Sequence, residues 1–421
     1  MTTAIYWFRN DLRLSDNPAL VQACKDTDFL LPVYILESEL KQDSLKNYPN
    51  TSDLRSTFLQ ESLHDLRAQL RALGSDLFEF RGDYIDVLQG LGAQLKTNII
   101  YCEQIFTCKE LGVVSKLKKA GFKVKSFWQS SMLAPDSLPF ELIDMPDVFT
   151  QFRLKVEKHK LKFTNPVETL MVVSPLPPIS LSTEEFTGLD TSVVVKSFAG
   201  GESKAVLHIE QYFKRRLVDS YKKTRNQLIG MDYSSKFSPW LSLGCCSARG
   251  IAKQLIEYEY LHGPNEGTYW LWFELLWRDY FRFLYIKKLT KNSSLTDLND
   301  EPRAELCEAY SGIKFKRWSR GYTGDSFVDA GMRELLATGY LSNRMRQVVA
   351  SYWIYNLNGH WEVGEAWFRS QLLDYDIYSN EGNWQYIAGN GKDHQGGRQF
   401  NIAKQTQDHD PEGIYRTMWS T

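Results

Sequence analysis

The sequence predicts a doubly wound, Rossmann-like α/β domain with a parallel sheet, followed by an all-helical domain. Two observations carry this prediction: short β-branched or aromatic runs alternate with helical patterns over residues 1–130, and helical periodicity dominates from residue 200 onward. A chain of 421 residues is also long enough for two cores. We therefore expect one domain at 1–130, a linker at 131–199 and a second domain at 200–421.

Five runs in the first domain are typical of strands, and helical patterns such as residues 56–73 separate them. The expected strands are 4–8, 29–36, 76–82, 98–102 and 123–128. Strands that alternate with helices predict a parallel sheet with helices on both faces. No GxGxxG pattern follows the first strand, so a dinucleotide held in the usual first turn is not indicated.

Residues 131–199 show no sustained helical or strand periodicity and contain SPLPPIS at 174–180. Such a segment is typical of a connection that runs over the protein surface. Six helical patterns follow. The expected helices are 202–221, 247–260, 268–287, 326–338, 344–357 and 363–373.

Net charge, cysteine spacing and the lack of long apolar runs exclude several classes of protein. A formal net charge of −1 excludes a highly basic tail and leaves open a local basic groove. The six cysteines show no paired CxxC spacing, so we expect reduced thiols and no metal site. The chain opens with charges instead of a signal peptide, and no run approaches the ~20 apolar residues of a membrane span. We expect a cytoplasmic protein with no membrane segment.

Tryptophan is concentrated in the second half, where ten of the 12 indoles follow residue 200. The segment TYWLWFELLWRDYFRFL places Trp270, Glu274, Trp277 and Phe281 at helical spacing. Such a stripe is usually core, with its glutamate paired to an arginine. Because apolar, cationic and acidic groups crowd into one turn, the same face also suits a pocket that stacks bases.

Three other segments carry polar side chains near predicted helix ends. Ser234, Ser235, Lys236 and Ser238 precede or begin a helix, where they either bind a phosphate or serve as an ordinary cap; on this segment alone we favour the cap. The remaining two segments contribute Asn343, Arg344 and Arg346 at a helix start, and Asp374, Asp376 and Asn380 just before Trp384. The paired aspartates alone suit a magnesium site or a glycosidase pair, but no third acidic ligand supports either.

These four segments, in this order behind WFRNDLRLSDNPAL at 7–20, resemble the photolyase/cryptochrome family over nearly the whole chain. The resemblance implies an α/β antenna domain, a long linker and a helical domain that holds FAD in a U shape. It also implies an enzyme, a deoxyribodipyrimidine photolyase: light excites reduced FAD, which donates an electron to a cyclobutane pyrimidine dimer; the ring splits and the electron returns. The alternative is a non-repairing blue-light photoreceptor that signals through a partner or nucleic-acid binding.

The resemblance assigns roles residue by residue. It places Asp376 near the flavin ring and Asn380 opposite flavin N5, where a neutral amide suits several redox states. In the substrate cavity it places Asn343, Trp277, which stacks on the flipped lesion, and Glu274, which in its protonated form hydrogen-bonds the thymine edge. The remaining FAD contacts are the pyrophosphate and ribityl set, Tyr221, Ser234, Ser235, Lys236, Phe237 and Ser238, and the ion pair of Arg346 with Asp374 beside the ring.

Two positions resemble the cryptochrome DASH subfamily in particular. Tyr386 stands where enzymes that repair duplex DNA carry a second tryptophan, and Gln347 stands where they carry methionine. This implies substrate contacts at Gln347 and Tyr386, weak stacking on duplex lesions and a preference for single-stranded DNA. We expect the protein to act as a monomer.

The family reduces its flavin along three tryptophans, of which Trp384 and Trp361 match the first two. The third should lie ten residues before Trp318, where this chain has Glu308, with Tyr310 as a nearby substitute. Glu110, in TCKELGVV, resembles the glutamate that binds a folate in related proteins. It implies methenyltetrahydrofolate as antenna, and the alternative is an exposed helix glutamate.

Overall fold

The computed structural model describes residues 1–37, 51–179, 198–291, 304–390 and 396–420. Its first domain is built on a parallel five-stranded sheet in the order β3-β2-β1-β4-β5, which confirms the predicted α/β class. In the register, Ile5 of the central strand lies opposite both Leu31 and Ile100. The strands are β1 (Thr3–Phe8), β2 (Phe29–Leu36), β3 (Phe78–Arg81), β4 (Ile99–Glu103) and β5 (Lys123–Phe127).

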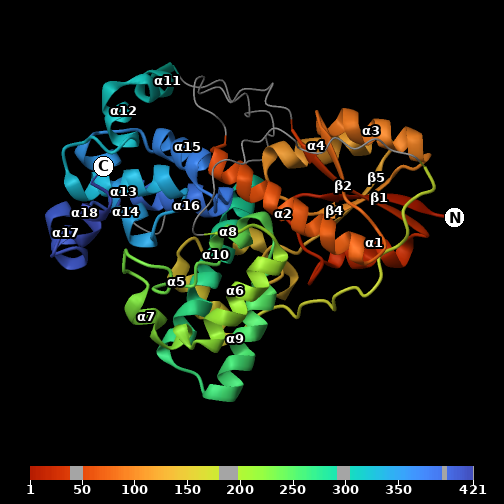
Figure 1. Ribbon diagram of the computed structural model, residues 1–421, viewed down its shortest axis with the longest axis horizontal. Coiled ribbons are helices and arrows are strands. Elements are labelled where there is room, and N and C mark those ends of the chain that lie inside the picture. Colours follow the sequence, from red (N-terminus) through yellow and green to blue (C-terminus); the bar gives the residue numbers. More distant parts are fainter. Residues whose placement is uncertain (38–50, 180–197, 292–303, 391–395, 421) are drawn as a thin grey trace.

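Helices cover both faces of this sheet because side chains along each strand alternate between the faces. Tyr6 and Phe8 pack with α1 (Pro18–Asp26) and α2 (Asp53–Ala72), whereas Trp7 packs with α3 (Tyr84–Leu95) and α4 (Cys108–Lys119). The local sequence starts α1 sharply: the Asn17 side chain accepts from the Leu20 amide at 3.1 Å, and a proline follows at the first helical position. Figure 1 shows this layered domain beside the helical one.

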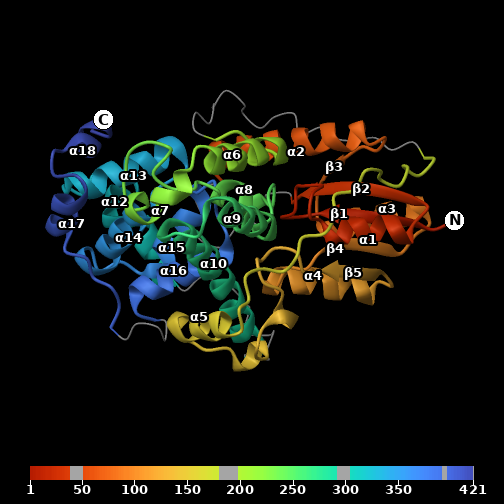
Figure 2. The same cartoon turned by 90° about the horizontal axis from the view of Figure 1, so that it is seen from below.

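The regular secondary structure of the second domain is helical over the described residues, as predicted, and α10 runs through its centre (Figures 1 and 2). The predicted helix at 202–221 is wrong in extent: it ends at Lys214, because Arg216 adopts a left-handed φ of 57°. The helices are α6 (Glu202–Lys214), α7 (Tyr221–Thr224), α8 (Ser238–Leu243), α9 (Ala248–His262), α10 (Glu266–Lys291), α11 (Ala304–Ser311), α12 (Ile313–Ser319), α13 (Ser326–Thr338), α14 (Asn343–Ser351), α15 (Trp361–Gln371), α16 (Ile377–Ala388), α17 (Ile402–His409) and α18 (Ile414–Met418).

The connecting segment contains a helix that the sequence patterns did not predict, α5 (Phe149–Lys158). Its buried face, Phe149, Phe152 and Val156, belongs to a core cluster that continues into α10, and Figure 2 shows the two helices together. Part of the expected linker, residues 180–197, lies outside the described residues. The boundaries at 130 and 200 therefore stay a proposal.

Buried polar contacts fix the two domains against each other. Arg249 of α9 forms an ion pair with Asp16 at 2.9 Å, and both side chains are nearly inaccessible. The glycine that ends α8, Gly244, has a φ of +67°, and a Cβ there would lie 1.9 Å from the Asn10 carbonyl oxygen. Only glycine lets the helical domain approach this closely.

None of the helices in the described ranges is both long and apolar enough to cross a membrane.

Candidate active site

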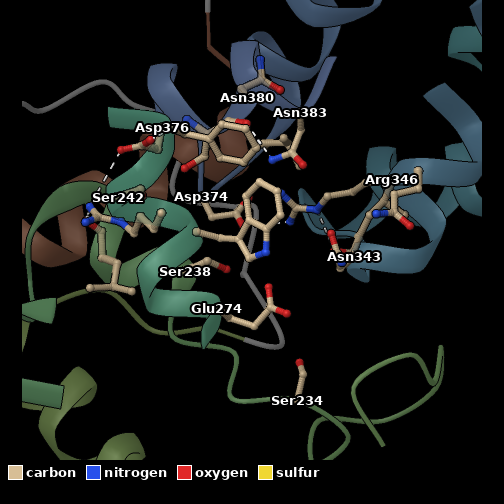
Figure 3. Close-up of a pocket in the computed structure, with 18 of the residues that line it drawn as sticks. Ser234, Ser238, Ser242, Glu274, Asn343, Arg346, Asp374, Asp376, Asn380 and Asn383 are labelled. Atoms are coloured by element: carbon tan, nitrogen blue, oxygen red, sulfur yellow. Dashed lines mark hydrogen bonds and ion pairs between the residues drawn. The ribbon is translucent and has the colours of Figure 1, made fainter. Parts of the chain in front are cut away.

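A cavity of about 420 Å³ opens in the helical domain, within the range of small-molecule sites. Figure 3 shows side chains converging on it from α10 (Glu274), α14 (Asn343, Arg346) and α16 (Asn380, Asn383). Most of the site residues expected from the sequence line this cavity: Tyr221, Ser234, Ser235, Lys236, Phe237, Ser238, Glu274, Trp277, Asn343, Arg346, Gln347, Asp374, Asp376, Asn380, Trp384 and Tyr386. Trp361 and Glu110 do not.

One end of the cavity is formed by the turn before α8. Lys236 has a left-handed φ of 56° and is only 4% exposed, and its ammonium lies 3.6 Å from the ring centroid of Tyr233 and 4.4 Å from that of Tyr340. Burial lowers the pKa of Lys236 to about 7, although the nearby Glu334 carboxylate opposes this shift. An anion placed here would restore a normal charge to a partly desolvated lysine.

A second polar group lies where the chain leaves α15. Arg346 donates from Nη2 to Asp374 Oδ2 at 2.8 Å, and its Nε donates to the Leu341 carbonyl at 2.9 Å. The other carboxylate oxygen, Asp374 Oδ1, is buried and accepts no hydrogen bond from the described residues. Because a buried acceptor left unpaired is costly, this oxygen is suited to a ligand donor.

The start of α16 carries the third group. Asp376 caps the helix by accepting from the Ser379 amide at 2.9 Å, and Arg282 donates to it at 3.0 Å. Although burial acts to raise the pKa of Asp376, the Arg282 and Arg278 guanidiniums lower it overall, so the carboxyl is ionised. Asn380 donates its amide nitrogen to the Glu365 side chain at 2.8 Å and to the Glu365 carbonyl at 3.2 Å. Its carbonyl oxygen is thereby the group left for a ligand.

Glu274 and Trp277 form the wall contributed by α10. Glu274 is ion-paired with Arg225, whose guanidinium lies 4.3 Å from the Trp270 ring centroid. Trp270, which belongs to the same helical stripe, packs against the core and the Arg225 guanidinium and is not among the residues that line the cavity. Trp277 does line it, and Phe149 stacks on the indole with centroids 3.6 Å apart and an interplanar angle of 13°.

Tyr386 and Gln347, the two subfamily positions, lie on the same cavity. The Tyr386 ring lies 6.3 Å from that of Trp277 at 70°, and its hydroxyl accepts from Arg398 at 3.3 Å. Two aromatic rings and one guanidinium thus lie next to one another on this side of the cavity.

The remaining expected residues lie apart. Trp384 lines the cavity and packs on Gly364 of α15, whereas Trp361, three residues earlier on that helix, is half-buried outside it. Glu110, in the first turn of α4, is ion-paired with the buried Arg9, and its side chain is 18% exposed. The alternative of an exposed helix glutamate is therefore wrong.

Sequence reasoning missed several lining residues that have no motif of their own. Arg225 stands in TRNQLIG, where only its distance of nine residues from Ser234 hints at a shared site. Others come from different helices or loops: Ser242, Arg278, Tyr340, Asn383 and Arg398.

Comparisons with known proteins agree with this arrangement. A family model described as DNA photolyase matches residues 4–172, and one described as the FAD binding domain of DNA photolyase matches residues 270–420. A cryptochrome DASH from Gloeobacter violaceus is 41% identical over 99% of this chain and 85% of its own length. The crystal structure of a Synechocystis sp. PCC6803 cryptochrome has a TM-score of 0.89 at 38% identity, covering 99% of this chain and 88% of that one. A class III photolyase from Agrobacterium tumefaciens has a TM-score of 0.82 at 26% identity, covering 100% and 87%.

The cavity fits the FAD that this domain binds. The unpaired Asp374 oxygen can accept from a flavin or ribityl donor, and the desolvated Lys236 beside three serines suits a pyrophosphate. The family models, the full-length relatives and this polar lining point to one conclusion. The chain belongs to the cryptochrome DASH group of the photolyase family, with an FAD-binding helical domain.

Proposed function

We propose that this protein is a photolyase that uses blue light to split cyclobutane pyrimidine dimers, preferentially in single-stranded DNA, as a monomer. The observation that carries the proposal is that Glu274 and Trp277 line the same cavity as Asp374 and Asn380. A lesion held by the first pair would therefore lie against a flavin held by the second. FAD supplies the light absorption and the transferable electron when bound.

Trp277 serves as a rigid shelf for a flipped base. Phe149 covers one side of the indole, so its orientation is set before any ligand arrives. Stacking on such a preorganised ring costs little ordering entropy. Extrusion of the lesion costs least where the duplex is absent, which supports the preference for single strands.

Arg225 and Glu274 would exchange partners when DNA binds. In the ligand-free protein the ion pair favours the ionised form of Glu274, so a protonated carboxyl requires Arg225 to move away. A DNA phosphate is a suitable new partner for the guanidinium. The carboxyl, left among the aromatic rings, then takes up a proton and donates a hydrogen bond to the thymine edge. Asn343, which lines the same cavity from the start of α14, supplies a neutral amide to the same lesion.

Asn380 and Asp376 hold the flavin ring in this proposal. Because the Asn380 amide nitrogen is committed to Glu365, its carbonyl oxygen can accept a hydrogen bond from a protonated flavin N5. This orientation favours the reduced cofactor that repair requires. Asp376, ionised and paired with Arg282, adds a fixed negative charge nearby.

The single-strand preference is supported by Tyr386 and Gln347. A phenol offers less stacking area than an indole, and Gln347 places an amide on the cavity wall where methionine would add an apolar contact. Both weaken the hold on a lesion that must be pulled from a duplex. We also propose Trp384 and Trp361 as electron donors to the flavin, and methenyltetrahydrofolate as an antenna beside Glu110, whose carboxylate Arg9 orients.

The test is a blue-light reaction of the chemically reduced protein with a thymine dimer in a single-stranded oligonucleotide, with a dark control. Recovery of thymine only in the light supports the proposal. No recovery from protein that carries FAD would contradict it and favour the alternative, a photoreceptor without repair activity.

A further inference from the structure

A line of indole rings leads from the cavity into the core of the helical domain. The Trp384 ring, on the cavity, lies 6.3 Å from that of Trp318 at 79°. Trp318 in turn lies 5.1 Å from Trp353 at 32°. Trp318 is 0% exposed and Trp353 2% exposed. Three indole rings of this core, the most easily oxidised side-chain type in it, are therefore in sequence and shielded from water.

No comparable line of touching rings leads onward from Trp361 within the described residues. Within the described ranges, Trp361 makes no ring contact, and the position where a third indole is expected holds Glu308, an exposed carboxylate that cannot give up an electron under these conditions. Tyr310 does not replace it, because it stacks at 4.4 Å on Phe315, whose phenyl ring is not readily oxidised.

The environment of Trp318 and Trp353 suits a positive charge shared by two rings. Both indole N–H groups donate to backbone carbonyls, Trp318 to Val349 at 3.1 Å and Trp353 to His360 at 2.7 Å. An amide carbonyl is too weak a base to take the proton, so an oxidised indole here stays a cation.

The backbone is also adapted to Trp353. This residue lies in a π-helical turn, Tyr352–Asn356, a rare conformation that is frequent at functional sites. A Cβ on Gly359 would lie 2.1 Å from the Trp353 indole, so the ring fits only against glycine.

We propose that Trp318 and Trp353 form a second electron-transfer branch that supplies the flavin through Trp384. The inference rests on the FAD of the proposed function and not on DNA repair. In each turnover Trp384 gives one electron to the photoexcited oxidised flavin, Trp318 refills Trp384, and Trp353 shares the resulting positive charge with Trp318. An external thiol at the surface returns one electron to this buried pair by tunnelling through the protein and releases its proton to water, and two thiyl radicals combine as a disulfide. Sharing the positive charge between two rings, neither of which is Trp384, slows its return to the flavin compared with a charge left on Trp384 alone.

The experiment compares Trp353→Phe, Trp318→Phe and Trp361→Phe with the matched control Trp367→Phe, another buried indole of this core, which packs on Phe315 at 5.8 Å. Transient absorption of the indole radical cation and light-driven flavin reduction with thiol are followed without DNA. We expect Trp353→Phe and Trp318→Phe to shorten the radical lifetime and lower the yield of reduced flavin at least as strongly as Trp361→Phe, with Trp367→Phe like native protein. Because Trp318→Phe can disturb packing, the result for Trp353→Phe is the decisive test of the branch.

Three results would each overturn the branch. They are native radical kinetics in Trp353→Phe, complete loss of flavin photoreduction in Trp361→Phe alone, and the absence of light-driven flavin reduction in native protein. A readout without flavin checks the pair itself: the far-ultraviolet circular dichroism difference between native protein and Trp353→Phe should contain an exciton couplet from two close indoles. Dimer repair by chemically reduced Trp353→Phe should stay native. Failure of repair in the native protein, with the branch intact, would contradict the proposed function alone.

Discussion

Arg225 holds the Glu274 carboxylate in an ion pair while its guanidinium rests on the Trp270 ring at 4.3 Å. The contact ties the loop after α7 to the centre of α10, and it occupies both groups that the proposed function assigns to DNA. Substrate binding must therefore break it.

Glu274→Gln should keep the affinity for a single-stranded dimer, because an amide can donate to the thymine edge and leaves Arg225 free. We expect an affinity within about threefold of native for Glu274→Gln and a loss of about tenfold for Glu274→Ala, the size of one net hydrogen bond. Titration of a labelled oligonucleotide measures both. Equal losses would mean that the ionised carboxylate is the working form.

Trp277→Ala should weaken dimer binding by about ten- to a hundredfold, since stacking of one base on an aromatic ring contributes ~1–3 kcal/mol. Trp419→Ala, at the end of α18 and off the cavity, is the matched control and should bind like native protein. Electrophoretic mobility shift with and without the dimer gives the comparison. An unchanged affinity in Trp277→Ala would remove its assigned role.

FAD affinity should fall as the pH rises above about 7, the value to which burial lowers the pKa of Lys236. Below this pH the Lys236 ammonium is already charged, so it binds the pyrophosphate without taking up a proton. Above it the free protein holds a neutral amine, so binding takes up one proton and affinity drops by up to about tenfold per pH unit. Flavin fluorescence quenching by apoprotein between pH 6 and 8.5 follows this.

Two variants separate the groups that titrate in this window. Burial also raises the pKa of Glu334 to about 7, and its ionisation favours the Lys236 ammonium, so Glu334→Gln should steepen the fall. Lys236→Arg should abolish it, because a guanidinium stays charged. A native profile in Lys236→Arg would place the titration elsewhere.

Asp16→Asn should lower the free energy of unfolding by about 3–5 kcal/mol, the cost of leaving one member of a buried ion pair without its partner. Arg249 is the residue left unpaired, and Arg249→Met in the same chain should restore part of the loss. Asp232→Asn is the control: it breaks the pair with Arg215, in which both side chains are about half-exposed, and should leave the free energy of unfolding nearly unchanged. Urea denaturation measures all three; equal effects of Asp16→Asn and Asp232→Asn would contradict the account.

The regular elements were predictable where one periodicity ran without interruption. The strand at residues 29–36 and the helix at 326–338 agree with the structure residue for residue. Helix α5 was not predictable, because its apolar face is short and the surrounding sequence has no regular periodicity. Packing against α10 stabilises it. Tertiary contact overrides weak local propensity in such segments.

Within the site, motif residues were predictable and their partners were not. Lys236 and Asp374 stand in long recognisable segments and do line one cavity. The Arg225–Glu274 pair, the Phe149 shelf and the stack of Trp318 on Trp353 join residues that are far apart in sequence, so only the fold brings them together.

The central claim is most directly tested by one measurement: the initial rate of blue-light repair of the same thymine-dimer sequence, once single-stranded and once in duplex, by chemically reduced protein at equal enzyme and substrate. The account predicts rapid repair of the single strand and little repair of the duplex. Equal rates would contradict the role given to Tyr386 and Gln347, and no repair of either substrate would contradict the assignment of Glu274 and Trp277 to a lesion site.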